Sequence, residues 1–113
     1  MSLDVDLMVT QPVSVYSGNI THNLTTMARE VNFGGHLTLY DVMWRPEECG
    51  FKFAKDISEY LDLGFNILLA EPERLKQYNP ENGWGSYDGL VNFVYKYRNA
   101  CWDNPDAELR VSR

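Results

Sequence analysis

The chain has 113 residues, of which 44% are hydrophobic and 23% charged. These values are typical of one globular domain and not of a disordered or fibrous chain. The formal net charge of −6 disfavours binding to nucleic acid or to an anionic membrane, because both are themselves negative. The ten Lys and Arg residues are scattered from Arg29 to Arg113 and form no basic cluster that would override that charge.

The beginning of the chain lacks the basic region and the apolar run of a signal peptide, and no apolar stretch is long enough to span a bilayer. We therefore expect a cytoplasmic protein in which Cys49 and Cys101 remain reduced thiols. Neither cysteine has the Cys-x-x-Cys spacing of a metal site, and His22 and His36 lack the His-x-x-x-His spacing. We expect no metal ion and no cofactor.

Three segments have the pattern of strands. Apolar residues alternate with polar ones from Leu3 to Val9, which is the period of a strand with one buried face. Pro12 favours a turn over residues 10–12, and residues 13–17 form a second β-prone run. Residues 107–111 alternate again, so we expect a third strand at that end of the chain.

A first helix is expected to begin after Thr21, which is a good N-cap residue. The paired glycines within residues 32–36 supply the positive φ angles with which such a helix ends. Residues 37–44 are ambiguous between a short strand and an irregular turn, and we expect a loop. The apolar face of this first helix consists of Leu24, Met27, Ala28 and Val31.

A long amphipathic helix is expected from Glu47 to Leu69. Pro46 suits its first position, and Glu48 adds negative charge at the positive end of the helix dipole. Gly64 lowers helix propensity, so we expect another residue to pack closely against it. The apolar stripe consists of Ala54, Ile57, Leu61, Phe65 and Leu68.

The chain restarts as a short helix over residues 71–78 and continues as a polar loop over residues 79–85. Ser86 is a suitable N-cap for the last helix, and Pro105 lies where that helix must end. The apolar stripe of this helix consists of Leu90, Val94, Tyr97 and Cys101.

The element order β-β-α-α-α-β predicts an α+β fold. We expect a small antiparallel sheet, made of two N-terminal strands and one C-terminal strand, with three to four helices packed on one face. The chain has no internal repeat and no linker, so residues 1–113 are expected to form a single domain.

His22 and Asn23 stand together at a helix start. His22 is a candidate general base or ligand-binding residue there, because its imidazole would lie near the positive end of the helix. The structural alternative is a histidine that satisfies local backbone groups. The chain contains neither a Gly-x-Ser-x-Gly nucleophile motif nor a Gly-x-x-x-x-Gly-Lys phosphate loop.

The remaining candidate ligand-binding residues are two tryptophans and their neighbours. Trp84 lies between two glycines and is either a hydrophobic anchor or a stacking surface for a ligand. Asn82 and Tyr87 supply hydrogen-bonding groups beside it. Trp44 and Arg45 place an aromatic ring and a guanidinium before a helix N-terminus that favours anions. In the structural alternative, both tryptophans anchor the core and Arg45 pairs with a glutamate.

Three blocks carry a family resemblance. They read Asn-Ile-Thr-His-Asn-Leu over residues 19–24, Trp-Arg-Pro-Glu-Glu over 44–48, and Asn-Pro-Glu-Asn-Gly-Trp-Gly-Ser-Tyr over 79–87. Together they resemble a family of small uncharacterised proteins from bacteriophage, prophage and bacterial genomes. The resemblance covers nearly the whole chain, although residues 33–39 depart from the family's shorter connection. It implies an accessory protein of phage or mobile-element type, and it implies no reaction.

We expect a non-enzymatic binding protein that engages a small anionic, nucleotide-like ligand or a host protein. One alternative is a small enzyme with His22 as general base and Arg45 as anion binder. Another is an acidic protein that acts through surface charge alone. For the first two hypotheses we expect one concave surface, with Tyr87 as a further ligand-binding residue. The residues expected to converge there are His22, Asn23, Trp44, Arg45, Asn82 and Trp84.

Overall fold

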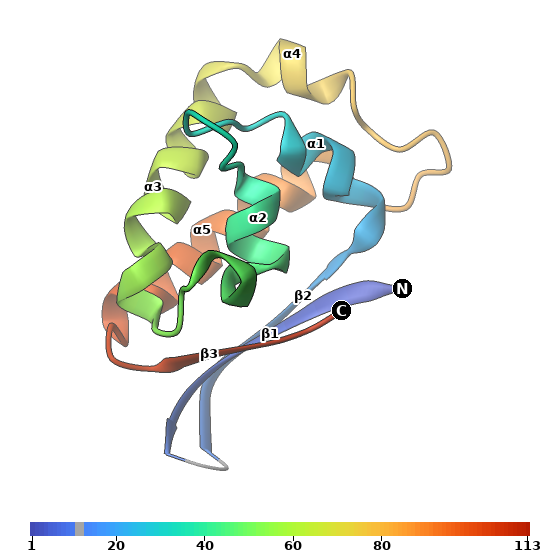
Figure 1. Cartoon of the computed structure of the whole chain (residues 1–113). Helices are drawn as coiled ribbons and strands as arrows, with labels where there is room; N and C mark the ends of the chain where they lie inside the picture. Colours follow the sequence, from blue (N-terminus) through green and yellow to red (C-terminus); the bar gives the residue numbers. More distant parts are fainter. Residues whose placement is uncertain (11–12) are drawn as a thin grey trace.

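A three-stranded antiparallel sheet and a layer of helices on one of its faces make up the molecule (Figure 1). The computed structural model describes residues 1–10 and 13–113. The strands are β1 (Ser2–Thr10), β2 (Val13–Thr21) and β3 (Glu108–Ser112), in the order β2-β1-β3. The predicted α+β class is therefore confirmed. The turn expected over residues 10–12 falls on residues 11 and 12, which lie outside the described part.

β1 is the central strand and provides the inner face of the sheet. Leu3, Val5 and Leu7 are completely buried, as their alternation predicts. Val9 was expected on the same face, but it is 52% exposed. β3 pairs with β1 only as far as Met8, so Val9 lies beyond the part of β1 that β3 covers.

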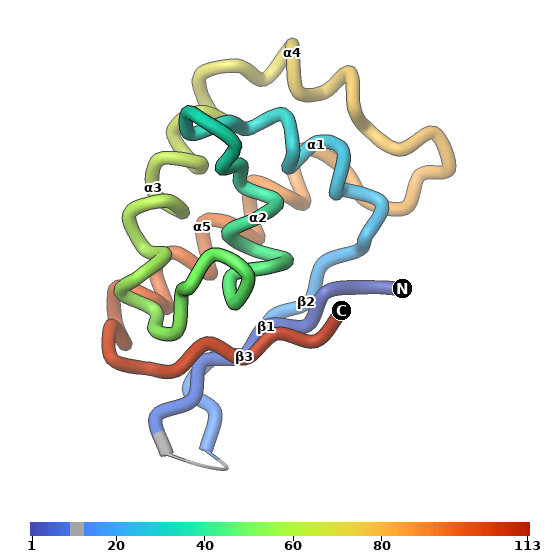
Figure 2. The backbone as a smooth tube through the Cα atoms, viewed as in Figure 1, coloured from blue at the N-terminus to red at the C-terminus, as the bar shows by residue number. Residues whose placement is uncertain are grey.

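Within the described residues, five α-helices and two 3-10 helices form the second layer. The two long helices, α3 (Ala54–Ala70) and α5 (Tyr87–Asp103), pack against each other. Figure 2 shows that both chain ends lie at the same end of the sheet. No helix in the described part is long and apolar enough to cross a bilayer. The shorter helices are η1 (His22–Leu24), α1 (Thr25–Arg29), α2 (Leu39–Trp44), η2 (Pro46–Cys49) and α4 (Pro72–Lys76).

The prediction of a loop over residues 37–44 is wrong, because α2 occupies most of that segment. Thr38 caps this helix: its Oγ1 accepts the N–H of Asp41, and Asp41 Oδ2 accepts the N–H of Thr38 at 2.9 Å. This reciprocal capping box satisfies two backbone donors at the start of a helix of only six residues. Four side chains of α2 are buried, so the helix contributes to the core.

The long helix begins later than expected, at Ala54 and not at Glu47. The expected first turn is the separate 3-10 helix η2, which ends at Gly50 with φ 81°. α3 then begins at Ala54, and the carboxylate of Asp56 in its first turn accepts the backbone N–H groups of Lys52 and Phe53, each at 2.9 Å. A 3-10 helix, a break at residues 50–53 and a later α-helix therefore replace one uninterrupted helix.

The apolar stripes of both long helices are confirmed. Phe65 is half-buried on α3, and the other predicted stripe residues of α3 and α5 are buried. The close packing expected at Gly64 is also present, since an added Cβ would lie 3.1 Å from Leu39 Cδ1 and 3.4 Å from Phe33. The helical layer is therefore held by the side chains that the helical periodicity identified.

Removal of the Asp56 carboxylate tests the start of α3. We expect Asp56→Ala to lower the free energy of unfolding at pH 7 by about 1 kcal/mol. The two backbone hydrogen bonds lower the pKa of Asp56 from its ordinary 3.8. The stabilisation is therefore present above pH 3.8 and is lost as the pH falls through the lower, folded-state pKa. Urea unfolding across that range measures it. Asp103→Ala, at the opposite end of a helix dipole, should be neutral or slightly stabilising.

Truncation within the α3 stripe tests the core. Leu61 is completely buried, and we expect Leu61→Ala to cost roughly 2–5 kcal/mol. Leu63 lies on the same helix but is 46% exposed, so Leu63→Ala should cost less than about 0.5 kcal/mol. Urea unfolding of both variants gives the comparison. Equal losses would contradict the assignment of the buried face.

Candidate functional site

Trp84 is held outward by the loop between α4 and α5. Gly83 and Gly85 have φ angles of 75° and 105°, which side-chain-bearing residues rarely adopt. Between them, the backbone N–H of Trp84 donates to Asn82 Oδ1 at 2.9 Å. The side chain of Trp84 is 70% exposed. It is therefore not a core anchor, and its aromatic ring is available for stacking.

This loop is fixed against the rest of the protein at two places. A Cβ added at Gly85 would lie 2.8 Å from Thr21 Cγ2 and 3.0 Å from Leu24 Cγ, so the backbone approaches the β2–η1 junction closely. At the other end, Asn79 Oδ1 accepts the N–H of Tyr87 at 2.7 Å. Trp84 is therefore presented by an anchored segment.

Tyr87 belongs to that anchor. Its side chain is 6% exposed, and its hydroxyl donates to the carbonyl of Leu68. Burial raises the pKa of the Tyr87 hydroxyl, and Asp88 adds to the effect. The prediction that Tyr87 contacts a ligand is not supported by this placement, because its polar atom is already engaged inside the protein.

A hollow of about 580 Å³ lies beside Trp84. Three segments meet there: the Trp84 loop, the end of β2 with η1, and the start of β1. None of the lining side chains carries a charge. The lining residues are Met1, Ser2, Asn19, Thr21, Asn23, Asn82 and Trp84.

The asparagines give this hollow both donors and acceptors. Asn19 Nδ2 donates to Ser2 Oγ at 2.8 Å and to the carboxylate of Asp4, and its Oδ1 has no donor among the described residues. Asn82 uses Oδ1 within the loop, and in the described part of the chain its two side-chain N–H donors have no protein acceptor. Among the described residues, the side-chain amide of Asn23 has no protein partner. An aromatic face beside unengaged amides suits an uncharged ring with polar groups at its edge.

His22 and Trp44 do not line the Trp84 hollow. Trp44 is 1% exposed, and its ring stacks on Tyr40 with centroids 5.6 Å apart. The ring of His22 meets Trp44 edge-on at 6.3 Å. His22 Nε2 and Trp44 Nε1 are both buried without a partner in the described part. The expectation of a ligand platform at Trp44 is therefore corrected, because this side chain is part of the core.

Arg45 is also separate from the hollow. Its Nε donates to the Tyr40 hydroxyl at 3.0 Å, and its Nη1 forms an ion pair with Glu48 at 2.6 Å. These hydrogen bonds raise the pKa of Arg45. The alternative in which Arg45 pairs with a glutamate is the one observed.

Of the six residues expected to converge, the hollow unites Asn23, Asn82 and Trp84. Sequence reasoning missed Asn19 and Thr21. The sequence feature that could have identified them is the polar-apolar-polar alternation Asn-Ile-Thr over residues 19–21. It continues β2 past the predicted end of the strand at residue 17. Extending the strand would have placed Asn19 on the face opposite the buried Ile20.

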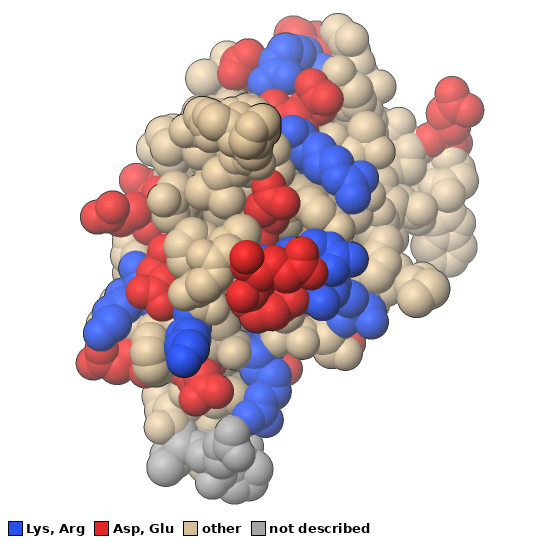
Figure 3. Space-filling model, in the orientation of Figure 1, with Lys and Arg blue, Asp and Glu red and all other residues tan. Residues whose placement is uncertain are grey.

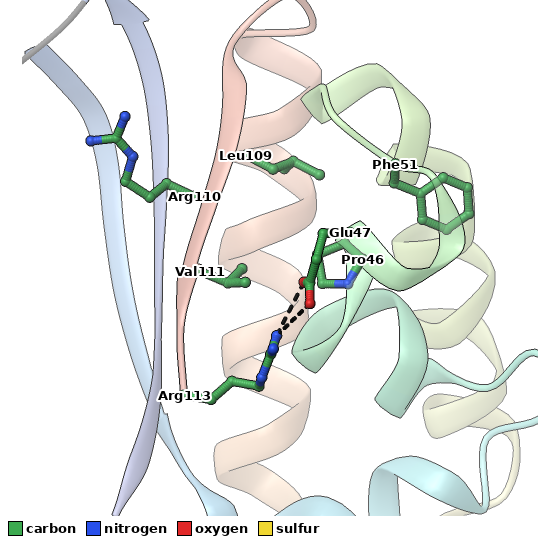
Figure 4. Close-up of a pocket in the computed structure, with 7 residues that line it drawn as sticks. All are labelled: Pro46, Glu47, Phe51, Leu109, Arg110, Val111 and Arg113. Atoms are coloured by element: carbon green, nitrogen blue, oxygen red, sulfur yellow. Dashed lines mark hydrogen bonds and ion pairs between the residues drawn. The ribbon is translucent and has the colours of Figure 1, made fainter.

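A second hollow, of about 400 Å³, lies between η2 and β3 (Figure 4). Arg113 crosses it to pair with Glu47 at 2.9 Å and to donate to the carbonyl of Trp44 at 2.8 Å. In Figure 4, Arg110 points away from this pair. The charged groups directed into this hollow thus neutralise each other, and it offers less to a ligand than the Trp84 hollow.

Surface charge forms no single-sign region on the face that Figure 3 shows, since acidic and basic side chains are interspersed there. Ion pairs such as Arg74–Glu71 at 2.8 Å account for part of this mixing. This face therefore offers no purely acidic patch through which the protein could act by charge alone.

The thiols also lack the features of a nucleophile. Cys101 is buried, and burial raises its pKa to about 12. Cys49 is partly buried, and its pKa is raised by that burial and by Asp41, Glu48 and Glu47. Both are free cysteines in the structure, and both raised pKa values keep the reactive thiolate scarce at neutral pH.

Thiol labelling tests these assignments. At pH 8 we expect Cys49 to react slowly with a disulfide reagent and Cys101 to react only after unfolding, because burial raises the pKa of Cys101 and blocks access. The labelled stoichiometry should rise from one to two on adding denaturant. Unfolded, non-reduced protein without reactive thiols would mean that the cysteines are paired.

No family model, no curated protein and no solved structure matches the chain. The resemblance to small phage and prophage proteins therefore remains a prediction. Function has to be inferred from the chemistry of the Trp84 hollow.

Proposed function

We propose that the protein is a non-enzymatic binding protein that holds the ring of a nucleotide-like ligand in the Trp84 hollow. One observation carries this proposal: Trp84 is 70% exposed although its loop is anchored at both ends. Tryptophan is normally well buried. An anchored loop that keeps a tryptophan exposed beside asparagine amides supports a role in stacking.

A nucleobase fits the chemistry of the lining. It is planar and can stack on an indole, and its edge carries both donors and acceptors. An asparagine amide can pair with such an edge through two hydrogen bonds, as with adenine N6 and N7. Asn23 and Asn82 both line the hollow together with Trp84. A volume of about 580 Å³ is within the usual range for small-molecule sites.

The proposed ligand is held by its ring and not by its phosphates. No Lys or Arg lines the hollow, and Arg45 is engaged by Tyr40 and Glu48. We therefore expect a nucleoside to bind about as tightly as the corresponding nucleotide, with little dependence on salt. This revises the anion-binding part of the sequence-based hypothesis.

The enzymatic alternative has weaker support. A general base must lie within hydrogen-bond reach of its substrate, whereas His22 Nε2 is buried against Trp44 and does not line the hollow. A host protein is the second candidate occupant, because exposed tryptophans often form the centre of protein interfaces. For either occupant, the proposed setting is that of a cytoplasmic accessory protein of phage or mobile-element type.

Isothermal titration calorimetry with a panel of nucleosides and nucleotides tests the proposal. We expect Trp84→Ala to weaken binding roughly 5- to 150-fold, which corresponds to about 1–3 kcal/mol for one base stacked on an aromatic side chain. Asn23→Ala should also weaken binding without changing the free energy of unfolding, because its side chain is exposed.

Trp102→Ala is the matched control. This tryptophan is 50% exposed on α5, packs against the Arg98 guanidinium 4.4 Å from its ring, and does not line the hollow. Its removal should leave the affinity unchanged. Absence of binding by the whole panel, or equal losses from Trp84→Ala and Trp102→Ala, would refute the proposed site. Trp84-dependent capture of a host protein without nucleoside binding would favour the second candidate.

A further inference from the structure

The lining of the Trp84 hollow includes three asparagines, Asn19, Asn23 and Asn82. A side-chain amide has an acceptor end and a donor end, and a ligand can use only the end that the protein does not engage. The hydrogen bonds that each amide makes within the protein therefore decide what it offers to a ligand.

Asn19 is fixed in one orientation. Its Nδ2 donates to Ser2 Oγ at 2.8 Å and to the carboxylate of Asp4, and these two bonds use both of its N–H groups. An ionised carboxylate can only accept hydrogen bonds. If the amide turned over, both bonds would be lost and Asn19 Oδ1 would face the carboxylate of Asp4, acceptor against acceptor. Asn19 therefore offers a ligand its acceptor end.

Asn82 is fixed in the opposite sense. Its Oδ1 accepts the backbone N–H of Trp84 at 2.9 Å, and a backbone N–H can only donate. Turning this amide over would place Nδ2 against that donor. Asn82 therefore offers a ligand its donor end.

Asn23 is not fixed by the protein. Its side chain is exposed, and in the described part of the chain its amide has no protein partner. This amide can turn to suit either end of a ligand's edge. Selectivity among ligands therefore depends on Asn19 and Asn82.

This polarity limits the class of ring that the hollow can hold. The ring must carry a hydrogen-bond donor where it meets Asn19 and an acceptor where it meets Asn82. In adenine and cytosine, an exocyclic amino group lies beside a ring nitrogen that can accept, so one edge supplies both groups. A ring without any N–H would leave the acceptor of Asn19 unsatisfied by the ligand.

We propose that the Trp84 hollow selects a base with an exocyclic amino group and that Asn19 accepts a hydrogen bond from this group. The inference rests on the proposed function, because it concerns the ring that stacks on Trp84. Asp4 does not line the hollow. It is a positioning residue, since it acts by holding the amide of Asn19 in one orientation.

Adenosine and purine riboside are matched ligands for calorimetry, because they differ only in the 6-amino group. Wild-type protein should bind adenosine about 2- to 10-fold more tightly, which is the effect expected of one hydrogen bond between neutral groups. Cytidine and its analogue without the 4-amino group form a second pair, for which the same preference is expected.

Asn19→Ala tests the proposed contact. This substitution should abolish the preference by weakening the binding of adenosine, while the affinity for purine riboside stays about the same. A general distortion of the hollow would instead weaken the binding of both ligands to the same extent.

Asp4→Asn tests the positioning role. The amide that this substitution introduces can donate to Asn19 Oδ1, so Asn19 is able to turn over and present its N–H groups to the hollow. The preference should then fall toward one, because purine riboside, whose ring nitrogens accept, binds more tightly than it does to the wild type. Asp6→Asn is the matched control on β1. The Asp6 carboxylate accepts the Ser17 hydroxyl and, among the described residues, makes no hydrogen bond with Asn19, so the preference should remain.

The outcomes separate this inference from the proposed function. Equal affinities within both ligand pairs, or tighter binding of uridine than of cytidine, would overturn the inference, while a Trp84-dependent affinity would still support the proposed function. The inference would also be overturned by a preference that Asn19→Ala leaves intact. Equal effects of Asp4→Asn and Asp6→Asn would overturn the role of Asp4. Absence of binding by every nucleoside would refute the inference and the proposed function together.

Discussion

The pairing of β1 with strands from both ends of the chain is the constraint on which the rest of the structure depends. β1 lies between β2 and β3, and its buried leucines and valine form the floor on which the helices pack. Because β2 must lie beside β1, its last residues and η1 emerge at the end of the sheet where β1 begins. The loop before α5 meets that junction at Gly85. The Trp84 hollow is thus a consequence of where the sheet ends.

The sequence predicted the elements with strong periodicity. The stripes of α3 and α5 and the strands at both ends of the chain follow from spacing alone. The errors occurred where short-range capping decides the structure. α2 depends on the reciprocal bonds of Thr38 and Asp41, and a six-residue helix is too short for a periodic signal. The start of α3 depends on Asp56, which competes with the earlier proline and glutamates for the same role.

The candidate site was predicted only in part for a related reason. Trp44 is followed within two residues by a proline, and Trp84 lies between two glycines. Both local sequences are therefore typical of turns, and they do not distinguish a buried tryptophan from an exposed one. Their burial differs because α2 directs Trp44 toward His22 and the core, whereas two glycines with positive φ turn Trp84 outward. Which side of a short helix faces the core depends on contacts with distant segments. Single-sequence patterns contain no information about those contacts.

The different surroundings of the tryptophans have an optical consequence. Trp44 is shielded from water, while Trp84 and Trp102 are 70% and 50% exposed. Their indoles therefore emit at different wavelengths, with Trp44 at the blue side of the spectrum and the other two at the red side. Loss of the fold shifts the blue component, whereas an aromatic ring placed on Trp84 changes the red component. A single emission spectrum thus reports separately on the integrity of the core and on the occupancy of the hollow.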